Sequence, residues 1–266
     1  MQVGEAGYIL GSSELIFLAV LAGARKLLGF VIEEQISTAK DAEELWKKIE
    51  PTLTQKRYLS KDADGLADVD RNLLEQIKIC ANPELVYTCK TSAGGRETDC
   101  CYYASQGKYA KLERDTNVDN RYILTPLRSY ARFTNSVYDL MEYFEEFDEF
   151  PISVDMKAED VKKAMSTPVG RLKNEPFAAG VPLDALSDIA EALGDKGESK
   201  LAVAIDARDG RMVADVMSFK GKKRLWKLER NGTEAFKLRA LSSEAYLECV
   251  KDIAGFAREE GGQGIA

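Results

Sequence analysis

The 266-residue sequence contains no histidine. Histidine is the commonest general base, the usual activator of serine and cysteine nucleophiles, and the commonest protein ligand of zinc, copper and non-haem iron. Carboxylate or lysine chemistry stays open, but no pair of carboxylates and no calcium-type loop has the spacing that such a site needs. The sequence therefore predicts a protein that is not an enzyme, with no catalytic residues, no cofactor and no metal.

Positive charge and membrane-length hydrophobic runs are also missing. Lys and Arg number 37 against 44 Asp and Glu, and the formal net charge of −7 disfavours binding to a phosphate backbone. The apolar run Leu15–Ala24 is too short to cross a bilayer. Glu5 and Glu14 stand where a secretory signal would carry basic residues. We therefore expect a cytoplasmic protein that binds neither nucleic acid nor membrane.

The cysteines form no recognisable framework. They are odd in number, contain no Cys-x-x-Cys motif and fit no disulfide spacing, at positions Cys80, Cys89, Cys100, Cys101 and Cys249. Reduced, mostly buried thiols are expected. The sequence leaves open whether Cys100 and Cys101 have a redox role.

The first half of the chain has the pattern of helices, an antiparallel meander and a closing helix. Capping residues and apolar spacing predict helices from Ser12 or Ser13 to about Phe30, from Asp41 to Pro51 (which kinks or ends it), from Asp70 to Ala81 and from Ser129 to Phe147. Strands are predicted at Glu84–Thr91, Cys100–Ser105, Lys108–Arg114 and Tyr122–Thr125, with a polar loop at Ser92–Asp99. The spacing within the closing helix places Phe144 and Phe147 on its apolar side.

The second half repeats this order. A short strand at Ile152–Met156 and helices at Ala158–Met165 and between Pro182 and Gly194 precede four strands and a final helix from Ser242 or Ser243. The strands are predicted at Lys200–Ala207, Arg211–Phe219, Arg224–Glu229 and Ala235–Leu241. Lys111-Leu112-Glu113-Arg114 recurs as Lys227-Leu228-Glu229-Arg230, each time in the third strand of its half. These parallels indicate an internal duplication, although two unrelated halves that share a meander would give the same pattern.

The predicted fold class is α+β, with two pseudo-two-fold related halves that are each a four-stranded antiparallel meander flanked by helices. Residues 1–150 form the N-terminal half and residues 151–266 the C-terminal half, with the boundary behind the acidic segment that precedes Pro151. Separate sheets and a joined sheet are both compatible with the pattern. We favour a continuous sheet, because joining removes two exposed edges, and expect helices on one face and at the ends.

The order of elements resembles that of EspG-type secretion chaperones of the type VII (ESX) systems. The resemblance rests on the run Leu73–Pro83, the strands that follow it up to Arg114, and their echo at Leu186–Leu193 and Leu201–Leu241. It covers most of the chain from about residue 66 and contains no signature motif. An extended apolar N-terminal helix and several cysteines depart from the family. The resemblance implies a diverged relative, a cytosolic chaperone that binds a helical secretion substrate before export.

The resemblance also implies a partner-binding site. Family members hold the tips of helical-hairpin substrates with the sheet, an extended hairpin loop and the C-terminal helices, and the matching loop here is Thr91–Asp99. The candidate residues in this loop are Ser92, Gly94, Gly95, Arg96 and Glu97. Tyr102 and Tyr103 face opposite sides of their strand, so one of them is a candidate exposed aromatic. The alternatives are a hairpin tip without a role and tyrosines that pack beneath a helix.

One acidic cluster follows the closing helix of the first half, at Glu142, Glu145, Glu146, Asp148 and Glu149. We interpret it as a solvated face that could also attract a basic partner, because no calcium-type loop surrounds it.

Three functions fit these observations. The leading hypothesis is a cytosolic, protein-binding chaperone or adaptor for a helical substrate of a type VII-like secretion system. The first alternative is an immunity protein that neutralises a secreted toxin, and the second is an uncharacterised structural or interaction protein. The partner's identity, the face that binds it and the oligomeric state stay open.

Overall fold

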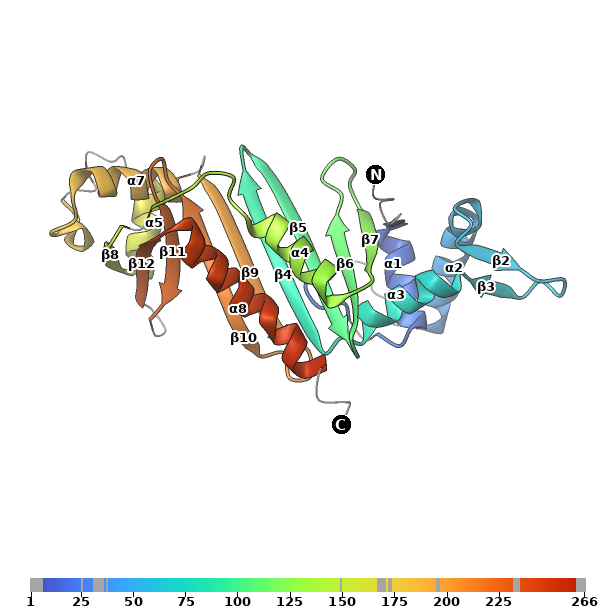
Figure 1. Cartoon of the computed structure of the whole chain (residues 1–266). Coiled ribbons are helices and arrows are strands. Elements are labelled where there is room, and N and C mark those ends of the chain that lie inside the picture. The colour runs from blue at the N-terminus through green and yellow to red at the C-terminus, as the bar shows by residue number, and fades with distance from the viewer. Residues whose placement is uncertain are drawn as a thin grey trace.

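One ten-stranded antiparallel sheet organises the molecule (Figure 1). The computed structural model describes residues 7–24, 26–30, 36, 38–148, 150–166, 171, 174–194, 197–231 and 235–261. The strand order is β1-β7-β6-β5-β4-β9-β10-β11-β12-β8, and a separate two-stranded hairpin pairs β2 with β3. The predicted α+β class, with a large antiparallel sheet flanked by helices, is confirmed.

The first half of the chain supplies five neighbouring strands of the sheet. They are β1 (Tyr8–Gly11), β4 (Leu85–Ala93), β5 (Arg96–Ser105), β6 (Lys108–Arg114) and β7 (Arg121–Leu127). The small hairpin of β2 (Leu59–Lys61) and β3 (Ala67–Val69) lies apart from them. The helices of this half are α1 (Ser12–Leu21), α2 (Ala39–Gln55), α3 (Arg71–Ala81) and α4 (Tyr130–Met141).

The second half supplies the other five strands. They are β8 (Ser153–Lys157), β9 (Glu198–Asp206), β10 (Met212–Lys220), β11 (Leu225–Arg230) and β12 (Ala235–Leu241). Its helices are α5 (Ala158–Ser166), the 3-10 turn η1 (Pro176–Ala178), α7 (Leu183–Leu193) and α8 (Ser243–Gly261).

The two halves join through an antiparallel pair in the middle of the sheet. β4 pairs with β9 from Leu85 opposite Asp206 to Ser92 opposite Ser199. The favoured continuous sheet is therefore what the structure contains. Read outward from this junction, the first half runs β4-β5-β6-β7-β1 and the second half runs β9-β10-β11-β12-β8.

The repeated tetrapeptide occupies equivalent places in the two halves. Lys111 in β6 forms an ion pair of 2.7 Å with Glu113, and Lys227 in β11 forms one of 3.2 Å with Glu229. Both copies lie in the third strand from the junction. This correspondence favours the duplication, while the pseudo-two-fold axis and the division at residue 150 stay predictions.

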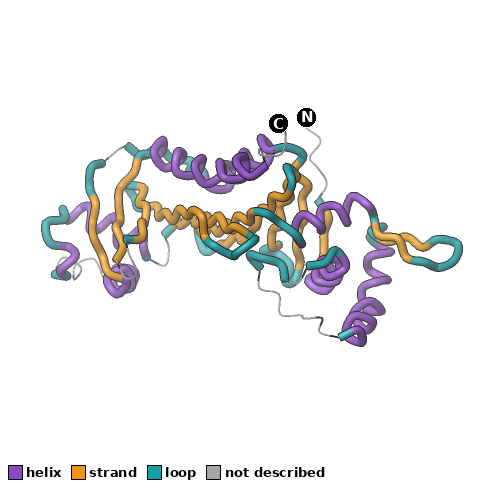
Figure 2. Tube along the Cα trace, turned by 90° about the horizontal axis from the view of Figure 1, so that it is seen from below, coloured by secondary structure: helices purple, strands orange, loops and turns teal. Residues whose placement is uncertain are grey.

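Helices cover both faces of the sheet, so the expectation of helices on one face is wrong (Figure 2). α4 and α8 lie side by side on one face over the middle strands. The opposite face is covered by α1 to α3 in the first half and by α5 and α7 in the second. The reason is that most strands carry apolar side chains on both sides of the pleat, which must all be removed from water.

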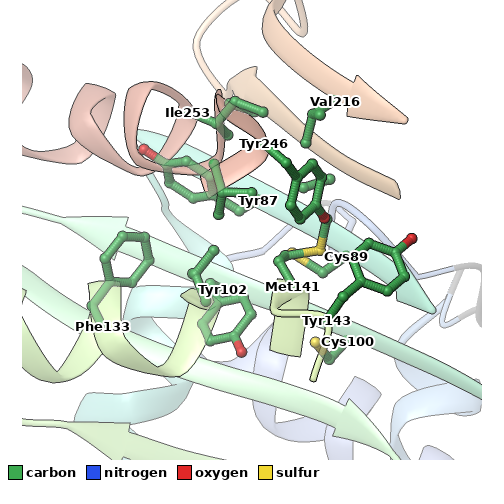
Figure 3. Packing of buried hydrophobic residues seen from close by; sticks show 14 of the residues in the cluster. Tyr87, Cys89, Cys100, Tyr102, Phe133, Met141, Tyr143, Val216, Tyr246 and Ile253 are labelled. Carbon is green, nitrogen blue, oxygen red and sulfur yellow. The ribbon is translucent and has the colours of Figure 1, made fainter. Parts of the chain in front are cut away.

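The core beneath α4 and α8 draws on both halves (Figure 3). Tyr87 of β4 packs edge-on against Phe133 of α4, with ring centroids 5.1 Å apart. Tyr246 of α8 packs against Tyr143, with centroids 5.3 Å apart, and Val216 of β10 completes this part of the core. The halves thus share one apolar layer.

Several element boundaries differ from those predicted. α1 ends at Leu21 rather than near Phe30, because Gly23 has a φ of +91°. α2 continues past Pro51 to Gln55. The strands β1, β2 and β3 were not predicted, since each has only three or four residues. The Asn231-Gly232 turn predicted before β12 lies partly outside the described residues.

Among the helices described by the structure, none combines the length and apolar character needed to cross a membrane.

Candidate partner-binding site

The predicted loop at Thr91–Asp99 is in fact the end of a regular hairpin. β4 and β5 pair up to Ala93 opposite Arg96, so only Gly94 and Gly95 form the turn. Their φ angles of +58° and +77° are left-handed, as a type I′ turn requires, and glycine adopts them without steric cost. The segment is polar because it is an exposed strand end, which the sequence pattern cannot distinguish from a loop.

The candidate residues of this hairpin lie together at one end of the sheet. Ser92 is half-buried and pairs with Glu97 on β5 and with Ser199 on β9. Gly94, Gly95, Arg96 and Glu97 are exposed. Figure 1 shows this turn along the upper edge of the sheet. The tip is therefore accessible to a partner.

The expectation that Tyr102 or Tyr103 is exposed is wrong, because both side chains are 0% exposed. They do face opposite sides of the sheet. The Tyr102 hydroxyl donates to the Ser136 carbonyl of α4 (2.7 Å), and the Tyr103 hydroxyl donates to the Leu28 carbonyl on the other face (2.8 Å). Since both faces are covered at this point, the tyrosines are packing residues and do not reach the surface.

A depression beside the hairpin tip brings together segments that are distant in sequence. An open depression of about 480 Å³ is lined by Gly94, by Glu145 and Glu146 of the segment after α4, and by the β10–β11 turn at Gly221–Lys223. Sequence reasoning missed the last two as site residues. The only signal for them was charge, since the first segment is acidic and the turn is basic.

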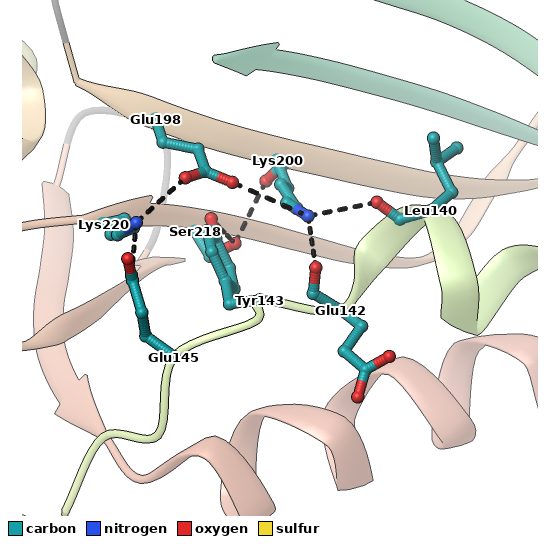
Figure 4. Close-up of polar contacts among 8 residues, drawn as sticks. All are labelled: Leu140, Glu142, Tyr143, Glu145, Glu198, Lys200, Ser218 and Lys220. Atoms are coloured by element: carbon teal, nitrogen blue, oxygen red, sulfur yellow. Dashed lines mark hydrogen bonds and ion pairs between the residues drawn. The ribbon is translucent and has the colours of Figure 1, made fainter. Parts of the chain in front are cut away.

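Ion pairs at the depression connect the segment after α4 to strands β9 and β10 (Figure 4). Glu198 at the start of β9 lies 3.3 Å from Lys220 and 3.8 Å from the Lys200 ammonium. Lys220 also pairs with Glu145. These ion pairs of alternating charge hold the segment after α4 against the ends of strands β9 and β10.

Lys200 sets the end of α4. Its buried ammonium donates to the carbonyl oxygens of Leu140 (3.2 Å) and Glu142 and lies 4.5 Å from the centre of the Tyr143 ring. These contacts satisfy carbonyls that a helix end leaves free. The helix predicted to run to Phe147 therefore stops at Met141. Burial lowers the pKa of Lys200, although Glu198 acts in the opposite direction.

A second depression lies on the other face of the hairpin. It has a volume of about 360 Å³ and is lined by Lys90, Ser92 and Asp99 together with Leu201 and Met217 from the second half. Burial raises the pKa of the Asp99 carboxyl, while Lys90, 4.0 Å away across the strand pair, acts against this. The hairpin is thus bordered by a depression on each face.

Within the described ranges, no group of His, Cys, Asp or Glu side chains is placed to hold a metal ion. Cys89 and Cys100 are buried and face each other across β4 and β5. A hydrogen bond with Cys100 and burial raise the pKa of Cys89, so its nucleophilic thiolate form is disfavoured.

The acidic cluster after α4 is solvated, as predicted, at the four members that the structure describes. Glu142, Glu145, Glu146 and Asp148 are all exposed, while Glu149 lies outside the described residues.

Comparison with known proteins finds likeness in structure but not in sequence. No family model matches the chain, and no curated protein matches it. A chain from the solved structure of the Mycobacterium tuberculosis type VII secretion system chaperone EspG5 in complex with PE25-PPE41 dimer has the same fold, with a TM-score of 0.64. The match covers 94% of this chain and 96% of that chain at 11% identity. The resemblance to EspG-type chaperones is confirmed at the level of the fold, and the low identity fits a diverged relative.

Proposed function

We propose that this chain is a cytoplasmic, protein-binding chaperone or adaptor for a helical substrate of a type VII-like secretion system. The observation that carries the proposal is the likeness of nearly the whole chain to a chaperone that was solved with a protein dimer bound. Fold alone does not assign function, so the proposal also rests on the site.

The site supports protein binding at the hairpin end of the sheet. The exposed tip presents backbone and charge, with Arg96 and Glu97 beside two glycines, and the depression beside it is open. The depressions on its two faces are shallow and mixed in polarity. Such a surface suits a partner that surrounds the tip.

The first test is capture from the native host. The tagged protein is used to recover bound proteins, these are identified by mass spectrometry, and each candidate is then made recombinantly and titrated against the chain by calorimetry. A small helical secretion substrate that binds directly supports the proposal. Recovery of a toxin domain whose activity the chain abolishes would instead establish the immunity function. If no recovered protein binds the chain directly, both the chaperone and the immunity functions are contradicted.

Two matched variants locate the contact. Arg96 follows Gly95 at the candidate end of the sheet, and Arg211 follows Gly210 in the β9–β10 turn at the opposite end. Both arginines are exposed, and both glycines have open space around an added Cβ. We expect Arg96→Glu to weaken substrate binding about tenfold, because it reverses a charge at the contact. This change corresponds to about 1.4 kcal/mol of binding free energy.

Arg211→Glu is the control and should leave the dissociation constant unchanged within about twofold. Equal losses in the two variants would mean that the hairpin tip is not where the partner binds.

A further inference from the structure

Phe144 is the most exposed of the large hydrophobic side chains among the described residues, with 97% of its surface in water. Sequence spacing placed it on the buried side of a helix, but α4 ends three residues earlier, at Met141. Single exposed hydrophobic residues are common and need no explanation by themselves. What distinguishes Phe144 is how its backbone is held.

The chain is fixed immediately before Phe144. Lys200 donates to the carbonyls of Leu140 and Glu142, and Tyr143 is buried with its hydroxyl 3.0 Å from the Ser218 hydroxyl. Glu142 has an extended backbone, with φ −69° and ψ 138°. Side chains alternate along extended backbone, so an inward Tyr143 turns Phe144 outward.

The chain is fixed again immediately after Phe144. Ser243, at the start of α8, receives a hydrogen bond from the Phe147 backbone N–H (2.8 Å) and donates its own N–H to the Phe147 carbonyl (3.0 Å). Its hydroxyl also donates to the Glu145 carbonyl (3.3 Å). The segment Glu142–Phe147, here called the pinned segment, is therefore ordered before any partner arrives, which reduces the entropy cost of binding.

The pinned segment adjoins the hairpin tip. Its residues Glu145 and Glu146 line the same depression as Gly94. Phe144 therefore stands at the border of the candidate site, on the face covered by α4 and α8. A partner that surrounds the hairpin tip meets this aromatic ring as well.

The charge around Phe144 defines the kind of surface that fits it. Glu142, Glu145, Glu146 and Asp148 are exposed within four residues of it. The two lysines that contact this segment, Lys200 and Lys220, are mostly covered, and the exposed Lys222 and Lys223 lie in the β10–β11 turn at the depression. A complementary surface is an apolar socket bordered by Lys or Arg side chains.

We propose that Phe144 is the aromatic anchor of the partner interface and enters an apolar, basic-rimmed socket between helices of the secretion substrate. This inference rests on the proposed function and deepens it. Aromatic side chains are enriched among the residues that contribute most to binding in protein interfaces.

The test uses the recombinant helical substrate identified with the wild-type protein. We expect Phe144→Ala to weaken its binding about 30-fold, which corresponds to about 2 kcal/mol. The melting temperature should stay unchanged, because 97% of the side chain is already in water. Leu183→Ala is the matched control, since Leu183 is 62% exposed at the start of α7 on the opposite face. It should change binding by less than about twofold.

A second measurement tests whether basic side chains of the partner surround its apolar socket. Raising the salt concentration should weaken wild-type binding, and Glu142→Gln combined with Glu146→Gln should remove most of that salt dependence.

The outcomes separate this inference from the proposed function. If the wild type binds the substrate and the Phe144→Ala variant binds it as tightly, the assignment of Phe144 as the anchor is wrong and the chaperone function stands. If the wild type binds no helical substrate, both fail. If the wild type is a dimer in solution and the Phe144→Ala variant is a monomer, the ring belongs to a self-association interface and the substrate assignment is overturned.

Discussion

Asp206, the last residue of β9, binds the turn that follows it. Its carboxylate accepts hydrogen bonds from the Arg208 backbone N–H (3.0 Å) and from Arg208 Nε (2.9 Å) and Nη2 (2.6 Å). The side-chain hydrogen bonds to Arg208, followed by the backbone hydrogen bond, lower the pKa of Asp206 to about 2. An unfolded aspartate titrates near pH 3.9, so folding favours the charged form.

The Asp206 carboxylate should contribute to the loss of folding stability at acidic pH. Because the folded pKa is the lower one, its stabilising effect is complete above about pH 4 and is lost as the pH falls from about 4 towards 2. We expect Asp206→Asn to lower stability at pH 7 and to reduce the loss of stability between pH 4 and 2, measured by urea unfolding at a series of pH values. Arg208→Gln should act in the same direction, and an acid slope equal to that of wild type in Asp206→Asn would contradict this role.

α3 shows how one capping residue fixes where an element starts. Asp70 stands before the helix, and its Oδ1 accepts a hydrogen bond from the Leu73 N–H (2.8 Å). The helix then buries Leu73 and Ile77 against the sheet. The cap and the apolar stripe were both predicted from the sequence, because each depends on residues only three or four positions apart.

Removing the cap should weaken the helix without changing its packing. We expect Asp70→Ala to lower the free energy of unfolding by about 1 kcal/mol, measured by urea denaturation at neutral pH. Asp68→Ala, at an exposed position in β3, is the control and should change it by less than about 0.5 kcal/mol. If Asp70→Ala lowers the free energy of unfolding no more than Asp68→Ala does, water replaces the hydrogen bond of the cap.

At the scale of the whole molecule, the two halves are joined by the β4–β9 pair and by the core beneath α4 and α8. That core contains Tyr87 and Phe133 from the first half and Val216 and Tyr246 from the second. Neither half can separate without exposing this apolar surface, so we expect the halves to unfold together.

The chain offers a direct test, because its two tryptophans lie in different halves. Trp46 is in α2, and Trp226 is buried in β11. In a Trp46→Phe variant, Trp226 fluorescence reports on the second half and far-ultraviolet circular dichroism on the whole chain. The two urea transitions should coincide. A dichroism curve with an additional step would show that the halves unfold independently.

The sequence by itself determined the features that depend on near neighbours. The order of the helices and of the longer strands followed from apolar spacing, and the capped start of α3 followed from local chemistry. The connection between β4 and β5 was predicted as a longer polar loop that contains Gly94-Gly95. The tetrapeptide that recurs at Lys111 and Lys227 fixed the register between the two predicted halves, and its copies lie in equivalent strands of the sheet.

Only the tertiary structure decided which surfaces are covered. Tyr102 and Tyr103 are buried because helices or loops lie on both faces of β5, and Phe144 is exposed because Lys200, 60 residues from Leu140 in the chain, binds the carbonyls that end α4. Burial depends on contacts between segments far apart in sequence, whereas periodicity records only how one segment alternates. For that reason the position of the connection between β4 and β5 was predictable, and the exposure of Phe144 was not.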